Sequence, residues 1–382
     1  MSGPAPISRP SDLQNAGHRL ARDSLGPAFL AWAARRWPER RGLAIGTWAP
    51  PANGGSSQII LFELDWTEHG RPRSEKLVLH LEVADEPVFP RLSDRYGSSA
   101  EMEYRVQHAI AANSRAAVPP MVALECDPQY LGQPFYLAGQ VEGFVPPTFA
   151  LMSSPLMTAQ LSPVERTRLV MGGIDQLAAI HAIDWRRAGL EFLLPESAIG
   201  SVTQDHMRRV ADHVAFHLYG QRHPELEAGM AWLVANVPTD RALSLTWGDC
   251  RMGNMIYNSA CSPAAVLDWE GAAILPRDAD LGWWLLYDWR NHEGEGLARL
   301  PGVPSRPEQL DRYVELTGHR PANLTYWAVA ASVKTVMAMQ AIAHRMEVAG
   351  LVEPGQCTFM FNNHHTRFIQ LILDRADPLG LP

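Results

Sequence analysis

The sequence predicts an α+β fold with two lobes, a small β-rich N-terminal lobe and a larger α-helical C-terminal lobe. Two patterns carry this prediction. Between residues 47 and 82, short runs of apolar and β-branched residues bounded by turn residues are typical of strands. From residue 162 onward, apolar residues recur at the three-and-four spacing of amphipathic helices. We place the boundary so that residues 1–139 form the N-terminal lobe and residues 140–382 the C-terminal lobe.

The N-terminal lobe is expected to begin with a helix and to continue as a sheet that one further helix interrupts. A proline at position 38 closes the first helical pattern, and Gly70 and Pro72 mark a turn between two strands. In chain order we expect a helix at residues 12–37, strands at 58–66 and 75–82, a helix at 98–112, and strands at 121–125 and 135–141.

The C-terminal lobe is expected to be helical, with one short hairpin. We predict helices at residues 164–182, 200–219, 225–234, 280–289, 307–317 and 324–348. Residues 255–257 and 264–267 are short apolar runs on either side of a turn, which is the pattern of a hairpin. This hairpin would bring the residues that flank it, Asn254 and Asp268, to one end.

Composition excludes several classes of protein. The net charge is −8, from 33 basic and 41 acidic residues, and no long basic run is present, which argues against nucleic acid or an anionic membrane as a partner. The four cysteines show neither metal-ligand spacing nor a disulfide framework. The N-terminus has no apolar signal segment. We therefore expect a soluble cytoplasmic protein; its oligomeric state is not indicated.

Three polar residues suggest phosphoryl transfer. Asp249 and Asn254 lie five positions apart, and Asp268 follows the predicted hairpin. A carboxylate that orients an acceptor hydroxyl, followed by an Asn and an Asp that bind a metal, is the arrangement found in kinases. The alternative is that a Gly-Asp turn and a buried Asp coincide by chance.

A loop of small residues precedes the first long strand. Gly54, Gly55, Ser56 and Ser57 would allow backbone N–H groups to approach a phosphate. A plain hairpin turn has the same composition, so the loop alone does not decide between the two interpretations.

Motifs spread from residue 54 to residue 348 fit one family. They include Gly-Gly-Ser-Ser at 54–57, Glu103-Tyr104-Arg105, Val141-Glu142-Gly143, the run at 177–185 that contains His181, Gly248-Asp249 with Asn254, Leu267-Asp268-Trp269-Glu270 and Asp280-Leu281-Gly282-Trp283. With these motifs the chain resembles the kinase-like phosphotransferases typified by aminoglycoside phosphotransferases and choline kinases. Within them it is most similar to the subgroup related to the kinase-like domain of certain acyl-CoA dehydrogenases.

The resemblance implies a protein-kinase-like fold, ATP and Mg²⁺ as cofactors, and a role for each matching residue. Asp249 would position and deprotonate the acceptor hydroxyl, and Asn254 and Asp268 would bind Mg²⁺. Asp280 would brace the catalytic loop. Arg251 would either touch phosphate or substrate, or hold the loop through a salt bridge. The nucleotide would be held by Gly54, Gly55, Ser56 and Ser57 at its phosphates and by Phe135, Tyr136, Leu137 and Gly139 at adenine.

Three departures from the family pattern matter. One is that Leu275-Pro276-Arg277 replaces the Gly-Asp-Pro expected after the second motif, near the metal loop, which would reshape the acceptor side. Trp247 stands where the family has a histidine, so the histidine's contacts are lost. His80 stands where the family has a phosphate-binding Lys or Arg, and Lys76 is about 13 Å away along the strand. His80 paired with Glu103 would bind phosphate as an imidazolium, more weakly than an arginine would.

These residues leave three functional hypotheses open. The first is a kinase for a hydroxyl of a small molecule, the second a nucleotide-binding pseudokinase with a regulatory role, and the third other chemistry on a phosphorylated or CoA-linked substrate. The acceptor is also open. Acidic residues at 293 and 295 would suit an aminoglycoside, whereas aromatic residues such as Trp283, Trp284 and Tyr287 would suit an apolar alcohol, which we favour.

Overall fold

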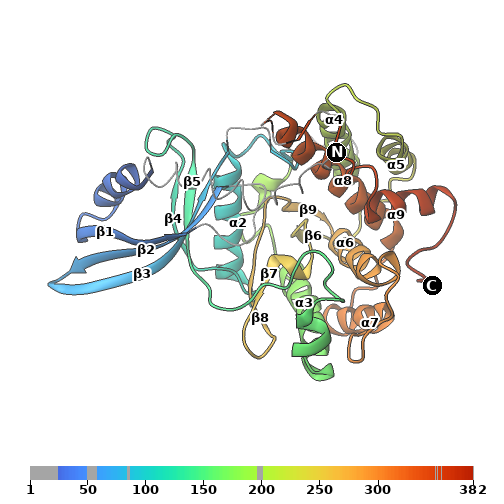
Figure 1. The fold of residues 1–382 in the computed structure, drawn as a ribbon, viewed down its shortest axis with the longest axis horizontal. Coiled ribbons are helices and arrows are strands. Elements are labelled where there is room, and N and C mark those ends of the chain that lie inside the picture. Colours follow the sequence, from blue (N-terminus) through green and yellow to red (C-terminus); the bar gives the residue numbers. More distant parts are fainter. Residues whose placement is uncertain are drawn as a thin grey trace, which may run out of the picture. The chain divides into compact units, whose positions relative to one another are not determined.

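A computed structural model of the chain describes residues 25–49, 58–83, 87–195, 201–348, 350, 352–353 and 355–381. The chain divides into two compact units, seen in Figure 1. The first contains Met1–Pro87, Tyr96–Arg105 and Pro119–Gln140, and the second contains Val88–Arg95, Val106–Val118 and Val141–Pro382. The predicted loop Gly54–Ser57 and the first half of the predicted helix at 12–37 lie outside the described residues.

A five-stranded antiparallel sheet forms the centre of the first unit. Its order is β1-β2-β3-β5-β4. The strands are β1 (Arg41–Ala49), β2 (Gln58–Glu68), β3 (Arg71–Leu81), β4 (Met121–Glu125) and β5 (Phe135–Gly139). Alternate residues of β2 and β3, such as Ile60, Leu64 and Leu79, are fully buried, as the strand period of two requires. They pack with Phe29 and Trp32 of the helix at residues 25–36.

Helix α2 (Ser99–Asn113) follows β3 in the chain. Ser98 begins it, because its hydroxyl accepts a hydrogen bond from the Glu101 amide at 3.0 Å. Glu103 lies in the second turn of this helix. The predicted helix at 98–112 and the predicted strands at 58–66, 75–82, 121–125 and 135–141 are thus confirmed to within a few residues.

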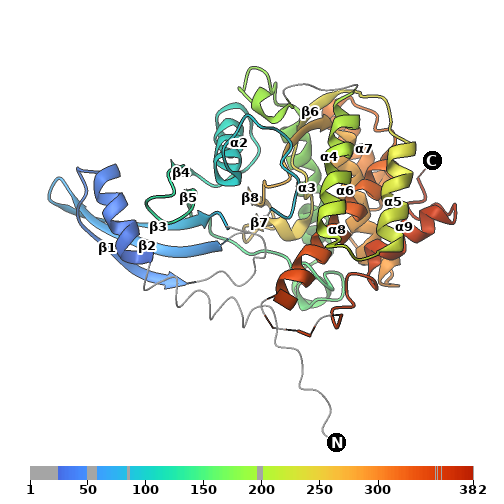
Figure 2. The same cartoon turned by 90° about the horizontal axis from the view of Figure 1, so that it is seen from above.

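Helices dominate the second unit. They are α3 (Pro163–His181), α4 (Val202–His217), α5 (Pro224–Ala235), α6 (Asp278–Trp289), α7 (Arg306–Thr317), α8 (Leu324–Val348) and α9 (His364–Leu373). Capping boxes begin three of them, at Ser162, Ser201 and Ser305. The long helix α8 is central, since it packs against α4, α5, α6 and α9 (Figure 2). All six predicted helices of this half are confirmed.

Two small hairpin-like pairs hold the loop that carries Asp249. Strand β6 (Leu243–Thr246) pairs with β9 (Ala273–Pro276), and β7 (Met255–Tyr257) pairs with β8 (Pro263–Val266). The second pair is the predicted hairpin, but the sequence analysis did not identify β6 and β9. Gly248 has φ of +93°, and a side chain there would collide with the carbonyl of Gly271, so this close approach requires glycine.

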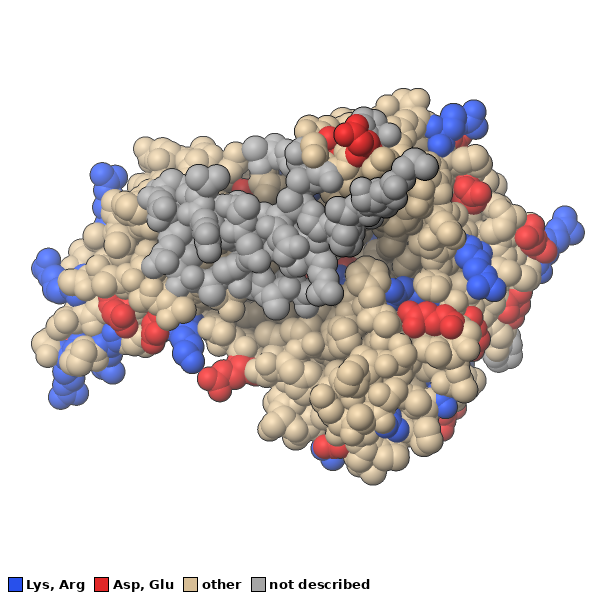
Figure 3. Space-filling view, in the orientation of Figure 1, with Lys and Arg blue, Asp and Glu red and all other residues tan. Residues whose placement is uncertain are grey.

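Charged side chains of both signs are interspersed on the face shown in Figure 3, and no broad patch of one sign is visible among its described residues. In the described part of the chain, no helix has the length and apolar character needed to cross a membrane.

Candidate active site

The loop between β6 and β7 brings Asp249 and Asn254 together. Both side chains are largely buried, with 7% and 6% of their surface exposed. The Asn254 amide donates hydrogen bonds to the Asp249 carboxylate at 2.7 Å and to the Asp249 carbonyl at 3.1 Å. A one-turn 3-10 helix, Met252–Asn254, produces this contact by turning the chain back on itself. The five-residue spacing therefore corresponds to a direct contact.

Arg251 lies between Asp249 and Asp268. Its Nε is 3.0 Å from each carboxylate oxygen of Asp249, and its Nη2 is 4.0 Å from Asp268 Oδ2. Its Nη1 donates to the hydroxyl of Thr148 at 2.9 Å. The salt-bridge role expected for Arg251 is therefore present in the structure. Contact with phosphate or substrate stays a prediction.

Asp268 follows β8 and has a left-handed backbone, with φ of +62°. A non-glycine residue in this conformation is uncommon and is enriched at functional sites. Burial and the neighbouring Asp249 carboxylate raise the pKa of Asp268 to about 6, against the opposing effect of Arg251. Two carboxylates thus share this site, with the guanidinium of Arg251 between them.

These residues fit a bound Mg²⁺. Carboxylate and amide oxygens are its preferred ligands, and Mg²⁺ is usually bound by one or two carboxylates together with substrate phosphates. The raised pKa of Asp268 and the position of Arg251 indicate a site that attracts positive charge. Among the described residues, no group of three His, Cys, Asp or Glu side chains is arranged to hold a metal by itself.

Asp280, at the start of α6, braces the catalytic loop from behind. Its carboxylate accepts hydrogen bonds from the backbone amides of Trp247 at 2.7 Å and Gly248 at 3.0 Å. His181 of α3 bonds the same carboxylate at 3.0 Å and the hydroxyl of Tyr313 at 2.7 Å. Burial alone would raise the pKa of Asp280, but these hydrogen bonds hold it below its usual value. The bracing role implied by the resemblance is confirmed.

Trp247, at the position of the expected histidine, makes contacts of its own. Its indole N–H donates to the carbonyls of Leu267 at 2.8 Å and Asp268 at 3.0 Å, and its ring is fully buried. The loss of the histidine's own contacts stays a prediction, but the position is not without contacts. The indole tethers the Asp268 segment to the catalytic loop, because a buried Trp N–H requires an acceptor.

We expect Trp247→Phe to leave both carbonyls without this donor and to lower the free energy of unfolding by about 1–3 kcal/mol. Affinity for Mg²⁺ and nucleotide should also fall, because Asp268 loses its tether. Urea denaturation and calorimetric titration would measure the two effects. Trp232→Phe, at a half-buried position on α5, is the matched control. If the two variants lose the same stability and the same affinity, Trp247 does not tether the Asp268 segment.

His80 does not form the imidazolium that the sequence suggested. The ring is half-buried and stacks on Tyr136, with centroids 4.3 Å apart and planes 10° from parallel. Burial lowers the pKa of His80 to about 4, so the ring is neutral at pH 7. The Tyr136 hydroxyl in turn donates to the Glu103 carboxylate at 3.0 Å. Tyr136 thus lies between the two residues that we expected to pair directly.

The proposed adenine strand offers a ligand little side-chain surface. Phe135 and Leu137 are fully buried in the core of the first unit, on the sheet face that packs against Trp32. Tyr136 is engaged with His80 and Glu103. Side-chain contacts from Phe135 and Leu137 to a nucleotide are therefore ruled out. The Gly139 amide donates to the Pro120 carbonyl at 2.7 Å, and the strand pairs with β3 on one side and with β4 on the other, so most of its backbone groups are also engaged.

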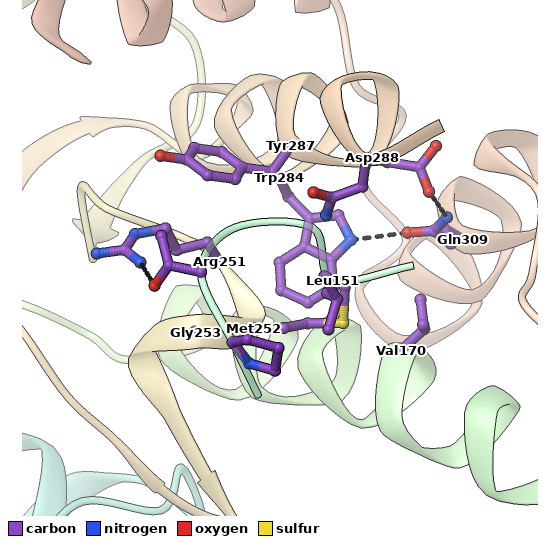
Figure 4. Close-up of a pocket in the computed structure, with 12 residues that line it drawn as sticks. Leu151, Val170, Arg251, Met252, Gly253, Trp284, Tyr287, Asp288 and Gln309 are labelled. Atoms are coloured by element: carbon purple, nitrogen blue, oxygen red, sulfur yellow. Dashed lines mark hydrogen bonds between the residues drawn. The ribbon is translucent and has the colours of Figure 1, made fainter. Parts of the chain in front are cut away.

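A pocket in the second unit adjoins the catalytic loop (Figure 4). It extends from Arg251 to Gln309 and Asp288, and much of its wall is apolar. Its lining residues are Pro147, Thr148, Leu151, Val170, Arg251, Met252, Gly253, Trp284, Tyr287, Asp288, Asn291 and Gln309. Sequence reasoning found Trp284 and Tyr287 as candidates but missed Thr148, which lies in an irregular segment and belongs to no recognisable motif.

The charge of Asp288 is neutralised within the protein. Its carboxylate accepts hydrogen bonds from Arg299 at 2.7 and 2.9 Å and from Arg306 at 3.1 Å. Arg306 also pairs with Glu293 at 2.8 Å. Asp288 and Glu293, which would suit an aminoglycoside acceptor, are therefore paired with arginines.

Comparison with known proteins places the chain in one family. Residues 64–321, more than half of the chain, match the family model described as the phosphotransferase enzyme family, and the chain belongs to that family. Among curated proteins it is 26% identical over 229 residues to acyl-CoA dehydrogenase family member 11 of Pongo abelii, covering 57% of this chain and 27% of that protein. The chain spans about a quarter to a third of the length of the curated relatives it matches.

Solved structures with the same fold are phosphotransferases. A candidate aminoglycoside phosphotransferase of Ralstonia eutropha is 22% identical, with a TM-score of 0.62, covering 90% of this chain and 98% of that chain. A thermostable mutant of aminoglycoside phosphotransferase APH(4)-Ia, in complex with ADP and hygromycin B, is 11% identical, with a TM-score of 0.51, covering 92% and 98%. At these identities the likeness establishes the fold alone. The predicted kinase-like α+β class is confirmed.

Proposed function

We propose that the protein is an ATP- and Mg²⁺-dependent phosphotransferase that moves the γ-phosphoryl group to a hydroxyl of a small molecule. The observation that carries this proposal is the contact of Asp249, Asn254 and Arg251, with Asp268 4.0 Å from the guanidinium. Membership of the phosphotransferase family supports the reaction class. The ADP in the APH(4)-Ia complex supports a nucleotide donor.

Asp249 is the proposed catalytic residue. It would accept the proton of the acceptor hydroxyl and orient the oxygen in line with the γ-phosphorus, while Asn254 holds its carboxylate in place. Asn254 and Asp268 would hold Mg²⁺, which when bound neutralises charge on the β- and γ-phosphate oxygens. Arg251 would leave Asp249 and stabilise the charge of the transferring phosphoryl group.

The nucleotide is proposed to be held by residues 1–139 and the acceptor by residues 140–382. For the phosphates we retain Gly54, Gly55, Ser56 and Ser57, and for adenine the end of β5 at Gly139. Neutral His80 would act as a hydrogen-bonding group, with Tyr136 linking it to Glu103. The cytoplasmic location also stays a proposal; it is supported by the free cysteines Cys250, Cys261 and Cys357, all buried.

We propose an acceptor with an apolar body. The pocket beside Arg251 offers Leu151, Met252 and Trp284 to such a group. A multiply charged aminoglycoside would need free carboxylates there, and Asp288 is already paired with two arginines.

A nucleotide-binding pseudokinase is the second candidate, and His80 favours it. A ring with a pKa of about 4 supplies no positive charge to the phosphates, so one cation common to these enzymes is missing. Losing one cation weakens catalysis without abolishing it, because the metal and Arg251 supply the other charges. A measurement of phosphate transfer distinguishes the two candidates, because only the enzyme would turn over ATP and an acceptor.

Calorimetric titration with ATP and with GTP, with and without Mg²⁺, tests the proposal. We expect micromolar binding that requires the metal. Binding by Asp268→Ala should be at least a hundredfold weaker, because metal coordination worth about 2.8 kcal/mol or more would be lost. Asp184→Ala, at a side chain 56% exposed, is the control and should bind as the wild type does. Absence of binding under every condition would refute the enzyme and the pseudokinase together.

A further inference from the structure

A second cavity in the second unit contains nitrogen donors without acceptors. Catalytic-loop residue Gly248 and parts of α4, α6 and α8 line it. Trp284 and Asp288 of α6 face the first pocket, whereas Asp280 and Trp283 of the same helix line this cavity.

Lys334 of α8 supplies the positive charge of the cavity. The side chain is 7% exposed, yet no carboxylate of the described residues lies within 4.0 Å of its ammonium group. The ammonium group lies over the rings of Trp283 at 4.5 Å and Phe89 at 5.9 Å, and the charges of Asp280 and Asp249 act on it from beyond direct contact. Lysine is almost never buried without a partner, because removing an ammonium group from water is costly.

Two further nitrogens in the cavity wall have no hydrogen-bond partner. The indole Nε1 of Trp283 and the Nε2 of His206 are both buried and unsatisfied. Their residues lie on different helices, α6 and α4, and both line the same cavity as Lys334. A buried polar atom without a partner indicates a bound water, ion or ligand, and two such atoms belong to residues that line the cavity with Lys334.

We infer that Lys334, Trp283 and His206 form a binding site for a small anionic group, a carboxylate or a phosphate. An anion would accept hydrogen bonds from the ammonium and the indole N–H, and also from the imidazole when its Nε2 carries the proton. It would thereby satisfy three groups at once. The site is distinct from the proposed metal residues, and anion binding there is measurable without nucleotide or turnover.

Asp280 is the acidic residue that lines the cavity, and its carboxylate does not occupy the donors. Both of its oxygens accept hydrogen bonds from the backbone amides of Trp247 and Gly248, and His181 bonds one of them. A lysine that served only to balance Asp280 would be expected in direct contact with it. Lys334 instead faces aromatic rings.

The lysine content of the chain permits a direct test. Lys76 and Lys334 are the only two lysines, so protein labelled with ¹³C at lysine Cε gives two lysine signals. Inorganic phosphate and acetate are titrated separately at constant ionic strength. We expect a saturable shift of the Lys334 signal at millimolar anion or below, while the signal of exposed Lys76 stays unchanged.

Variants and a competitor make the test decisive. Lys334→Met should fold, since an apolar side chain replaces a buried charge, and should lose the stabilisation against heat that phosphate gives the wild type. Trp283→Phe should weaken phosphate binding about tenfold, as expected for one lost hydrogen bond to a charged group. The inference is overturned if Lys334 does not respond, if both lysines respond alike, or if Mg²⁺ with a non-hydrolysable ATP analogue displaces the anion competitively. A cavity that holds only water gives the first of these results.

Discussion

Replacing Asp249 by Asn should reduce turnover about 10²–10⁴-fold and leave nucleotide affinity nearly unchanged. The amide cannot accept the proton of the acceptor hydroxyl, and loss of a positioned general base costs a factor of this size. The amide has the shape of the carboxylate, and its oxygen in the place of Oδ2 can still accept from Arg251 and Asn254 close to the present 3.0 and 2.7 Å, while its NH₂ group takes the place of Oδ1. The effect should therefore appear in kcat, with little change in the affinity for Mg²⁺ and ATP.

The measurement is phosphate transfer to a panel of apolar and aminoglycoside alcohols, monitored by ADP release and by identification of the product. Asp212→Asn, at a side chain 70% exposed on α4, is the matched control and should retain wild-type rates. A turnover within tenfold of the wild type in Asp249→Asn would show that Asp249 is not the base. No product from the wild type, together with normal nucleotide binding, would favour the pseudokinase.

The catalytic loop was predictable because its chemistry depends on spacing along the chain. Asp249 and Asn254 meet within one turn, and the short hairpin returns Asp268 to Arg251. The sequence is sufficient to predict a contact when the residues that form it are close in the chain. The helices and most strands were predictable for the same reason, since periodic apolar residues report which face is buried.

Contacts between distant segments were not predictable. Tyr136 lies opposite His80 in the sheet, and its hydroxyl donates to Glu103. His80 and Glu103 are therefore linked through Tyr136, which the sequence did not indicate. The tryptophan at position 247, in place of a histidine, suggested that contacts are lost. The sequence does not reveal that its indole N–H reaches a carbonyl twenty residues away. In the sequence, Lys334 is notable only as one of two lysines. Its burial beside Trp283 depends on tertiary packing.

Removing the Asp280 carboxylate should have the largest effect on stability. We expect Asp280→Ala to lower the free energy of unfolding by about 3–5 kcal/mol, the cost of breaking a buried hydrogen-bonded pair by removing one partner. Three groups would lose an acceptor, namely the amides of Trp247 and Gly248 and the imidazole of His181. Tm should fall by roughly 10 °C, and residual turnover should fall further than stability explains, because the loop that carries Asp249 is no longer fixed.

The Asp280→Asn variant distinguishes the effect of the hydrogen bonds that Asp280 accepts from the effect of its negative charge. Its carbonyl oxygen accepts from one backbone amide, but its NH₂ group faces the other donor, so a loss of stability between those of the wild type and the alanine variant is expected. Asp184→Ala again serves as the exposed control. Differential scanning calorimetry and rates measured well below Tm distinguish a destabilised enzyme from a misaligned one. If Asp280→Ala unfolds like the wild type, the catalytic loop holds its shape without the brace, and Trp247 must then be the residue that fixes it.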